Sequence, residues 1–387
     1  MDFSEIIGQE HLKNHLQTTA ENQRIPHAQL FVGQTGTGLL PMAIAYARSL
    51  LCLGLPTGSD ARKVSEQKVD KLMHPDLHFV YPVTKRNSNH RNPISKDFSV
   101  EWRNFIQDNP YGSLLDWMQS IGLENKQGNI GVSEAQDIVK TLSLKSYEGG
   151  YKVMIMWMAD RMNNECSNKI LKLIEEPPHK TVLLLLTEQE DSLLETIKSR
   201  CQTLHFPLLA EVDIAQALIE KENVENATAT KISRLAQGNY HRALKLLQSD
   251  GNDADFETWF ITLFRIAYMV SKKKDETLKL VSWSDTLASI GREPQKAFLG
   301  YCLETIRQAL LTNYNTKELV YFESNDKSFS IDKFAPFVHD GNIFKYTAAI
   351  EEAIYHVERN GSAKLIFSDL AMQFARAVHA KSSYQTT

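Results

Sequence analysis

The residues 33–40, GQTGTGLL, have the outline of a phosphate-binding loop. In an intact loop of the pattern G-x-x-x-x-G-K-[S/T], backbone N–H groups cradle the phosphates, the lysine neutralises the outer ones, and the hydroxyl reaches magnesium. Here Gly33, Gly36 and Gly38 keep the glycine pattern, whereas Leu39 and Leu40 replace the cation and the hydroxyl. The sequence therefore predicts a degenerate loop that keeps its backbone pattern and lacks the two side chains of its chemistry.

The segments on either side of the loop favour this interpretation over an ordinary glycine turn. Residues 28–32, AQLFV, predict a short apolar strand that leads into the loop, and residues 41–51 predict a helix that leaves it. Pro41 suits the first turn of a helix, where its missing N–H is not needed.

A second segment lacks the acidic groups that phosphate chemistry requires. Residues 152–159, KVMIMWMA, predict a strand that is buried on both faces of a parallel sheet. In phosphate-loop enzymes the end of this strand carries one carboxylate for magnesium and one for the attacking water. Trp157 and Met158 occupy those places, and only Ala159 and Asp160 follow. Intrinsic ATP hydrolysis is therefore not expected.

Length and composition are typical of a globular protein of several domains. The chain has 387 residues, 42% hydrophobic and 23% charged, which suits two or three domains that each bury a core. No apolar run approaches the roughly 18 residues of a membrane span, and the first residues are neither basic nor apolar. We therefore expect a cytoplasmic protein with no membrane contact.

Charge and cysteine usage limit the possible partners and metals. The net charge of -4 means that any nucleic-acid contact must come from a local patch. The four cysteines, Cys52, Cys166, Cys201 and Cys302, lie far apart and form no C-x-x-C pair. This spacing predicts reduced, mostly buried thiols and neither a disulfide framework nor a zinc site.

Strand and helix patterns alternate along the first half of the chain. Further strands are expected at residues 77–83, 181–187 and 203–206, and an amphipathic helix at 132–144. Glu175 and Glu176, followed by two prolines, are interpreted as the end of a helix and not as an acid/base pair. This alternation predicts a parallel sheet with helical cover.

Residues 84–129 are interpreted as an insertion with two helical segments. The apolar positions at helical spacing are expected to pack onto the body of the domain; they are Phe98, Trp102, Phe105, Ile106, Leu114, Leu115, Trp117, Met118 and Ile121. A basic cluster in the same segment, Lys85, Arg86, His90 and Arg91, is interpreted as a solvated loop in preference to a DNA-binding patch.

Several short motifs follow one another in a specific order across about two hundred residues. They are IGQ at 7–9, PHA at 26–28, the loop at 33–40, HPD at 74–76, YEGG at 147–150, NKILKLIEEPP at 168–178 and SRC at 199–201. With these motifs the chain resembles the AAA+ clamp-loader family, and within it the delta-prime subunits of the bacterial DNA polymerase III clamp loader.

The resemblance implies a three-part architecture. Residues 1–207 would form an α/β AAA+ module, a parallel sheet with helices on both faces, with a degenerate nucleotide site and an insertion near 84–130. Residues 208–255 would form a small helical lid, and 256–387 an all-α collar domain for oligomerisation. His241 stands where active relatives carry the sensor 2 arginine. Relatives often hold a four-cysteine zinc module, of which only Cys52 remains, so no metal is expected.

The resemblance also implies a function within an assembly. The chain would be a non-hydrolysing stator of the pentameric loader and part of the DNA polymerase III holoenzyme, with no cofactor of its own because neighbouring subunits bind the ATP. Its partners would be the motor subunits (gamma/tau), the delta subunit, the sliding clamp and primed DNA. Arg200, in the motif Ser199-Arg200-Cys201, would serve as an arginine finger for a neighbouring ATPase subunit.

Two other classes of function stay open at this point. The first is an atypical active P-loop ATPase, such as a helicase-type motor, which would need a cation and a carboxylate from elsewhere in the chain. The second is a stand-alone DNA-binding adaptor, supported only by the basic residues between Lys85 and Arg91. Nucleotide titration and salt-dependent DNA binding separate these alternatives from a clamp-loader subunit.

Overall fold

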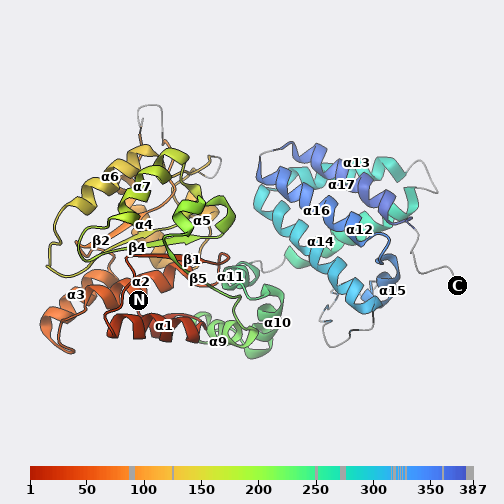
Figure 1. Ribbon diagram of the computed structural model, residues 1–387. Coiled ribbons are helices and arrows are strands. Elements are labelled where there is room, and N and C mark those ends of the chain that lie inside the picture. Colours follow the sequence, from red (N-terminus) through yellow and green to blue (C-terminus); the bar gives the residue numbers. More distant parts are fainter. Residues whose placement is uncertain are drawn as a thin grey trace. The chain divides into compact units, whose positions relative to one another are not determined.

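The structure is a computed structural model whose helices and strands are shown in Figure 1. It describes residues 1–86, 92–123, 126–248, 252–270, 276–314, 329–359 and 361–380, together with the single positions 316, 320, 322, 324 and 326. The chain divides into two compact units, residues 1–248 and 249–387.

The first unit is built on a five-stranded sheet in the order β2-β3-β4-β1-β5, with every neighbouring pair parallel. The strands are β1 (Ala28–Val32), β2 (Leu77–Val80), β3 (Lys152–Met156), β4 (Thr181–Thr187) and β5 (Gln202–His205). Parallel neighbours need long crossover connections, which place helices on the faces of the sheet. The predicted parallel sheet is therefore confirmed.

The side chains of the central strands alternate between two apolar cores. In β3, Val153 and Ile155 belong to one core, and Met154 and Met156 to the other. This is the two-residue period of a pleated strand whose two faces are both buried. Figure 1 shows helices on both sides of the sheet. The first core includes α1 (Glu10–Glu21), α2 (Leu39–Leu51) and α3 (Asp60–Asp70); the second includes α6 (Val132–Ser143), α7 (Asn164–Glu175) and α8 (Glu195–Lys198).

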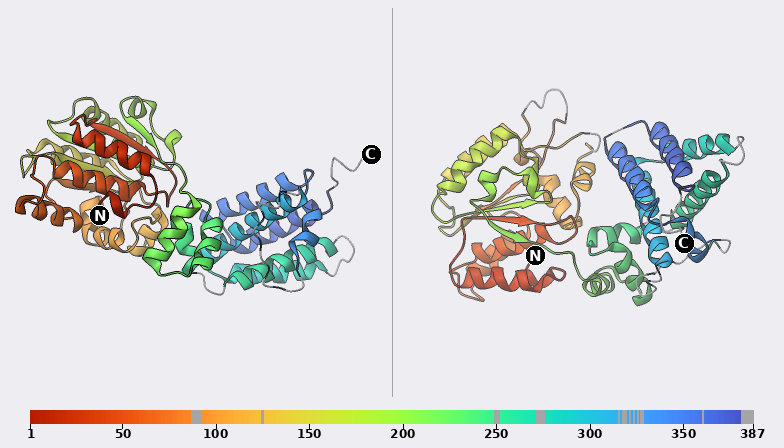
Figure 2. Two further views of the ribbon diagram at one scale, coloured as in Figure 1. Left: turned by 90° about the horizontal axis from the view of Figure 1, so that it is seen from below. Right: turned by 45° about the vertical axis from the view of Figure 1, so that its right-hand side comes forward.

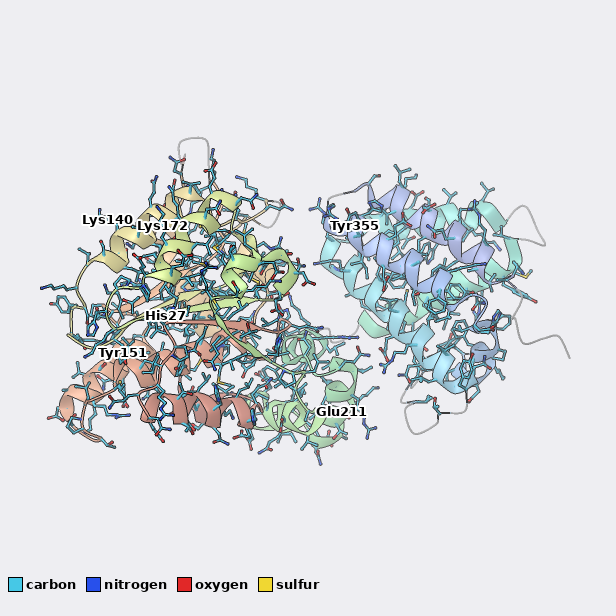
Figure 3. The ribbon with its side chains drawn as sticks, in the orientation of Figure 1. His27, Lys140, Tyr151, Lys172, Glu211 and Tyr355 are labelled. Atoms are coloured by element: carbon cyan, nitrogen blue, oxygen red, sulfur yellow. The ribbon has the colours of Figure 1, made fainter. Side chains whose placement is uncertain are left out.

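The outer surfaces of the covering helices are polar, as the amphipathic patterns predict. Figure 3 labels Lys140 on α6 and Lys172 on α7, both exposed, and His27 just before β1. Short 3-10 turns connect the main elements; they are η1 (Phe3–Glu5), η2 (Ser95–Phe98), η3 (Ala159–Arg161) and η4 (Glu190–Ser192).

The insertion contains two helices, α4 (Ser99–Asp108) and α5 (Leu114–Ser120). Its aromatic side chains are buried in the core on the α2 side of the sheet; among them are Phe98, Trp102, Phe105 and Trp117. Trp102 stacks on Tyr81 with ring centroids 3.9 Å apart. The expectation that these stripes pack onto the body of the domain is confirmed.

Several predicted boundaries are wrong by a few residues. The strand expected at 77–83 ends at Val80, close to Pro82, which cannot donate a ladder hydrogen bond. The strand expected at 152–159 ends at Met156, because Met158 has a left-handed backbone with φ 56° that turns the chain. The loop helix begins at Leu39 and not at Pro41, and the last strand lies one residue earlier than expected.

The HPD and YEGG motifs meet beside β2 and β3. The buried carboxylate of Asp76 accepts hydrogen bonds from the backbone N–H groups of Tyr147 and Glu148, at 2.8 and 2.9 Å, and from the Ser146 hydroxyl at 3.0 Å. His74 lies 3.1 Å from Glu148. Buried polar groups need such partners. These two motifs therefore fix the turn that leads into β3.

Three further helices complete the first unit: α9 (Glu211–Glu222), α10 (Asn226–Ala236) and α11 (Tyr240–Gln248). They share an apolar core of their own, which also includes Ile7 and Tyr111 from earlier in the chain. We refer to α9, α10 and α11 as the lid.

In its described residues, the second unit is formed by helices alone (Figure 2). They are α12 (Asn252–Val270), α13 (Glu276–Ser289), α14 (Arg292–Asn313), α15 (Ile331–Phe334), η6 (Ala335–Phe337), α16 (Ile343–Glu358) and α17 (Ala363–Ala377). The predicted all-α character of this region is confirmed, and so is the α/β module followed by a helical lid. The predicted domain boundaries at 207 and 255 stay predictions. None of the helices in the described part of the chain is long and apolar enough to cross a membrane.

Candidate functional site

The phosphate-type loop connects β1 to α2 at the carboxyl edge of the sheet. Gly36 and Gly38 have φ values of 81° and 98°, a left-handed conformation that favours glycine. Thr37 closes the turn, because its backbone N–H and its hydroxyl both donate to the carbonyl of Gln34, at 3.2 and 2.8 Å. The strand, loop and helix setting expected from the sequence is present.

The two leucines of the motif belong to the apolar core. Leu39 and Leu40 open α2, and their exposed fractions are 9% and 3%. A Cβ atom at Gly33 would lie 2.9 Å from the Leu39 side chain, so this leucine packs directly against the start of the loop. Neither position can supply a cation or a hydroxyl.

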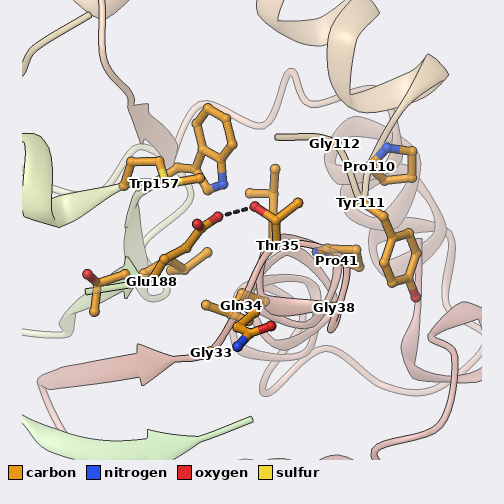
Figure 4. A pocket seen from close by; sticks show the side chains of 16 residues that line it. Gly33, Gln34, Thr35, Gly38, Pro41, Pro110, Tyr111, Gly112, Trp157 and Glu188 are labelled. Carbon is orange, nitrogen blue, oxygen red and sulfur yellow. Dashed lines mark hydrogen bonds between the residues drawn. The ribbon is translucent and has the colours of Figure 1, made fainter. Parts of the chain in front are cut away.

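The space beside the loop is a small cavity of about 30 Å³, shown in Figure 4. Its walls come from the loop, from the insertion and from the carboxyl ends of β3 and β4; they are residues 33–36, 38–41, 110–112, 157–158 and 186–188. Small-molecule sites enclose about 300 to 1,000 Å³, whereas one water needs about 10 to 15 Å³. The enclosed part of this space is therefore of the size that holds water molecules.

Trp157 and Met158 close one wall of this cavity. Both are buried, and the Trp157 ring packs against Trp102 and Phe105, with ring centroids 5.2 and 5.8 Å away. Asp160, the acid that follows, accepts a hydrogen bond from the Thr187 hydroxyl at 2.9 Å and does not line the cavity. The two positions predicted to replace the carboxylates of a phosphate-loop enzyme are thus buried, apolar side chains beside the loop.

Glu188 lines the cavity and was not predicted from the sequence. It follows β4 directly, and its carboxylate accepts a hydrogen bond from the hydroxyl of Thr35 in the loop (Figure 4). The surrounding protein partly removes the Glu188 carboxyl group from water, which raises its pKa, although the residue remains exposed at the surface. The sequence could have indicated Glu188 as a site residue, because it is a polar residue directly after a buried parallel strand and ligands bind at that edge of such sheets.

His241 lies next to the cavity in the lid but is not part of its wall. Its Nε2 atom is 3.1 Å from the carboxylate of Asp116 in the insertion. The neighbouring Arg242 donates to the side-chain oxygen of Gln237 at 3.0 Å. The position expected to correspond to sensor 2 therefore faces an internal carboxylate.

Arg200 is on a different part of the surface. Ser199 caps the end of α8, and the Arg200 side chain is 40% exposed. Its Nε atom lies 2.8 Å from Glu175, and Nη1 donates to the carbonyl of Thr196 at 2.9 Å. Burial raises the pKa of the Cys201 thiol to about 11, so this thiol stays protonated near neutral pH. The SRC motif and the loop are thus separate features of the unit.

Within the described residues, no group of three or more His, Cys, Asp or Glu side chains is arranged to hold a metal ion. Cys52, Cys166 and Cys302 are buried free thiols, and Cys201 is partly exposed, in agreement with the reduced state expected. In the basic cluster of the insertion, Arg86 pairs with Glu101 and lies over the Phe98 ring. His90 and Arg91 lie outside the described residues.

Comparison with known proteins agrees with this geometry. Residues 8–210 match the family described as "DNA polymerase III, delta subunit". The chain belongs to this family. It is 31% identical over 209 residues to the DNA polymerase III subunit delta' of Bacillus subtilis, which covers 54% of this chain and 50% of that protein. It is 27% identical over 197 residues to the subunit delta' of Escherichia coli, covering 51% and 55% of the two chains.

The resemblance extends to other subunits of the same polymerase. The chain is 24% identical over 249 residues to the subunit tau/gamma of Haemophilus influenzae, which covers 63% of this chain and 30% of that protein. A solved structure of a gamma subunit-related protein from Thermotoga maritima covers 94% of this chain and 99% of that one, with 14% identity and a TM-score of 0.37. The chain spans about half the length of the curated delta' proteins from B. subtilis and E. coli.

Proposed function

We propose that the chain is a non-hydrolysing stator of the DNA polymerase III clamp-loader complex. Neighbouring motor subunits of the gamma/tau type would bind the ATP, and the delta subunit and the sliding clamp would be the other protein partners. The complex would place the clamp on primed DNA in the cytoplasm. Family membership supports a role in this complex.

One observation carries the proposal: apolar core side chains lie behind the loop, and only a small cavity remains beside it. Leu39 and Leu40 are part of the core, and the cavity that remains measures about 30 Å³. Glu188 also turns a carboxylate toward the loop. Phosphoryl transfer depends on positioning and charge neutralisation. A loop with no lysine and a carboxylate beside it would repel a triphosphate.

The surface position of Arg200 supports the second part of the proposal, an arginine finger that acts on a neighbour. The guanidinium lies at the end of a helix, partly exposed, and its pairing with Glu175 involves a carboxylate that is itself 46% exposed. Such surface pairs are worth about 0 to 1 kcal/mol, so the guanidinium can leave Glu175 at little cost. A phosphate oxygen of an adjoining subunit's nucleotide would offer a stronger bidentate partner.

Direct titration with magnesium-ATP tests the first part. We expect no binding at micromolar nucleotide and no turnover by the isolated full chain, because the loop N–H groups can hold an anion but not a metal-bound triphosphate. A tau/gamma subunit measured in the same buffer is the positive control. Micromolar affinity or measurable hydrolysis by this chain would contradict the proposal, whereas binding of inorganic phosphate would not.

A further inference from the structure

The lid is joined to the insertion by a charge cluster around Asp116. This carboxylate, at the start of α5, lies 3.1 Å from His241 Nε2 and 2.7 Å from Lys245 Nζ, both on α11. The side chains of Asp116 and His241 are only 11% and 13% exposed. Burial would raise the pKa of Asp116, but His241, Lys245 and Ser113 together outweigh it and lower this pKa. The carboxylate is therefore charged at neutral pH.

Tyr111, which lies between α4 and α5, makes the second connection. Its hydroxyl accepts a hydrogen bond from the backbone N–H of Ile7 at 2.9 Å. Its ring packs edge-on against Tyr240 of α11, with centroids 5.1 Å apart, and a Cβ atom at Gly38 would lie 3.5 Å from the ring. One buried side chain thus contacts the N-terminal segment, the phosphate-type loop and the lid.

The loop and the lid also meet directly. The backbone N–H of Tyr240 donates to the carbonyl of Gly36 at 3.1 Å. A Cβ atom at Gly36 would lie 2.8 Å from the backbone nitrogen of His241, too close for any side chain, so only glycine fits at this contact. The lid therefore rests on the loop with no intervening layer at this point.

We propose that residues 109–120 of the insertion act as a built-in replacement for nucleotide that holds the lid in one position. Tyr111 fills space beside the loop, and Asp116 supplies the negative charge that the lid residue His241 faces. In a nucleotide-binding protein a ligand between loop and lid would provide both. This inference rests on the proposed function, because a chain that bound ATP would have another way to hold its lid.

Hydrogen-deuterium exchange of the full chain tests the inference. Asp116→Asn removes the charge and keeps the shape of the side chain. We expect exchange about tenfold faster in α11, since the variant loses hydrogen bonds to a charged group that hold this helix in place. The strands β3 and β4 should exchange as in the parent chain. Asp108→Asn, at an exposed aspartate that ends α4, is the matched control and should change nothing.

A second variant keeps the test decisive if Asp116→Asn folds poorly. Lys245→Met removes the half-exposed partner on the lid and should also speed exchange in α11. The double variant should exchange little faster than the faster single one, because both changes break the same contact. Unchanged α11 exchange in these variants, or a uniform rise that includes β3 and β4, would overturn the inference.

The same measurement separates this inference from the proposed function. Magnesium-ATP added to the parent chain should leave exchange in α11 unchanged. Nucleotide-dependent protection of the lid would contradict the non-hydrolysing assignment, whatever the Asp116 variant does. A lid that ignores both ATP and Asp116→Asn would leave the proposed function standing and remove the role of the insertion.

Discussion

Two regions of the first unit differ in what they present to solvent. At the loop, Leu39, Leu40 and Trp157 are exposed by 9%, 3% and 4%, whereas the Arg200 side chain at the end of α8 is 40% exposed. The first region is part of the hydrophobic core, and its packing stabilises the fold. The second keeps a charged group where another molecule can reach it. One unit thus combines a loop region that is closed to solvent with a charged group that is open to it.

The largest expected effect is the loss of ATPase activity on substitution of the exposed Arg200. If Arg200 is the proposed arginine finger, Arg200→Ala should lower ATP turnover at the adjoining site of the reconstituted complex on the order of a thousandfold, because the guanidinium would stabilise charge on the transferred phosphoryl group. Arg200→Lys should restore little, since an ammonium group lacks the planar fork. ATPase assays with clamp and primed DNA present would measure both effects.

A matched exposed arginine separates this role from a general loss of surface charge. Arg234 on the lid is 51% exposed and pairs with Glu211 at 3.9 Å. Arg234→Ala should leave the ATPase activity unchanged, and both variants should assemble normally. Equal activity of the Arg200→Ala and parent complexes would return Arg200 to the ordinary surface.

The loop region, which is part of the hydrophobic core, should lose stability when one of its buried side chains is truncated. Trp157→Ala removes a buried ring from the cluster with Trp102 and Phe105 and should lower the free energy of unfolding by about 3 to 5 kcal/mol. Tyr147→Ala removes an 82% exposed ring from the same unit and should change it by about 0.5 kcal/mol or less. Denaturant unfolding of both variants decides whether Trp157 stabilises the fold or only borders a site.

The stability of the first unit should also depend on pH, through a buried carboxylate outside the loop region. Glu134 on α6 is 2% exposed and accepts a hydrogen bond from the backbone N–H of Ser95, where the insertion begins its first helical turn. Burial raises the pKa of Glu134 from 4.5 to about 7. Because the folded chain holds this proton more tightly than the unfolded chain, stability falls as the pH rises from about 4.5 through 7.

Glu134→Gln keeps an acceptor oxygen and removes the titration. Between pH 4.5 and pH 8 this variant should gain about 3 kcal/mol of stability relative to the parent chain, because the pKa of Glu134 differs between the folded and unfolded chains. Urea unfolding across this range measures the difference. A constant difference between the two chains at all pH values would show that Glu134 does not titrate between these limits.

The smallest effect is expected at the contact between Tyr111 and Ile7. Tyr111→Phe keeps the ring and leaves a buried backbone N–H without its acceptor, which should lower the free energy of unfolding by about 1 to 3 kcal/mol. Tyr314→Phe, at a 58% exposed tyrosine of the second unit, is the control and should have no measurable effect. Equal stability of the two variants would mean that another acceptor replaces the Tyr111 hydroxyl.

The sequence predicts the sheet well because its strands are short apolar runs, a pattern that is typical of buried strands in a parallel sheet. β1 and β4 have the predicted bounds, and the burial of Trp102 and Trp117 follows from their spacing. Local pattern could not predict where β3 ends, because Trp157 and Met158 are as apolar as the strand itself. Their turn depends on a left-handed backbone that the tertiary contacts impose.

The candidate site was predictable only in part. The glycines, Leu39, Leu40, Trp157 and Met158 were predicted together, and the structure brings them to one cavity. Glu188 and Tyr111 come from segments that no motif covers. Their contribution depends on long-range packing: 104 residues separate Tyr111 from Ile7, and 153 separate Glu188 from Thr35. Sequence spacing carries no information at such separations.

The strand order has a consequence for how the chain is made. β1 lies between β4 and β5, so both of its ladder partners follow it by more than a hundred residues. A ribosome adds about 5 to 20 residues per second, so the apolar segment AQLFV waits on the order of ten seconds or longer for its neighbours. During that interval the nascent chain exposes an unpaired hydrophobic strand. Chaperone binding to this segment during translation would protect it until β4 and β5 emerge.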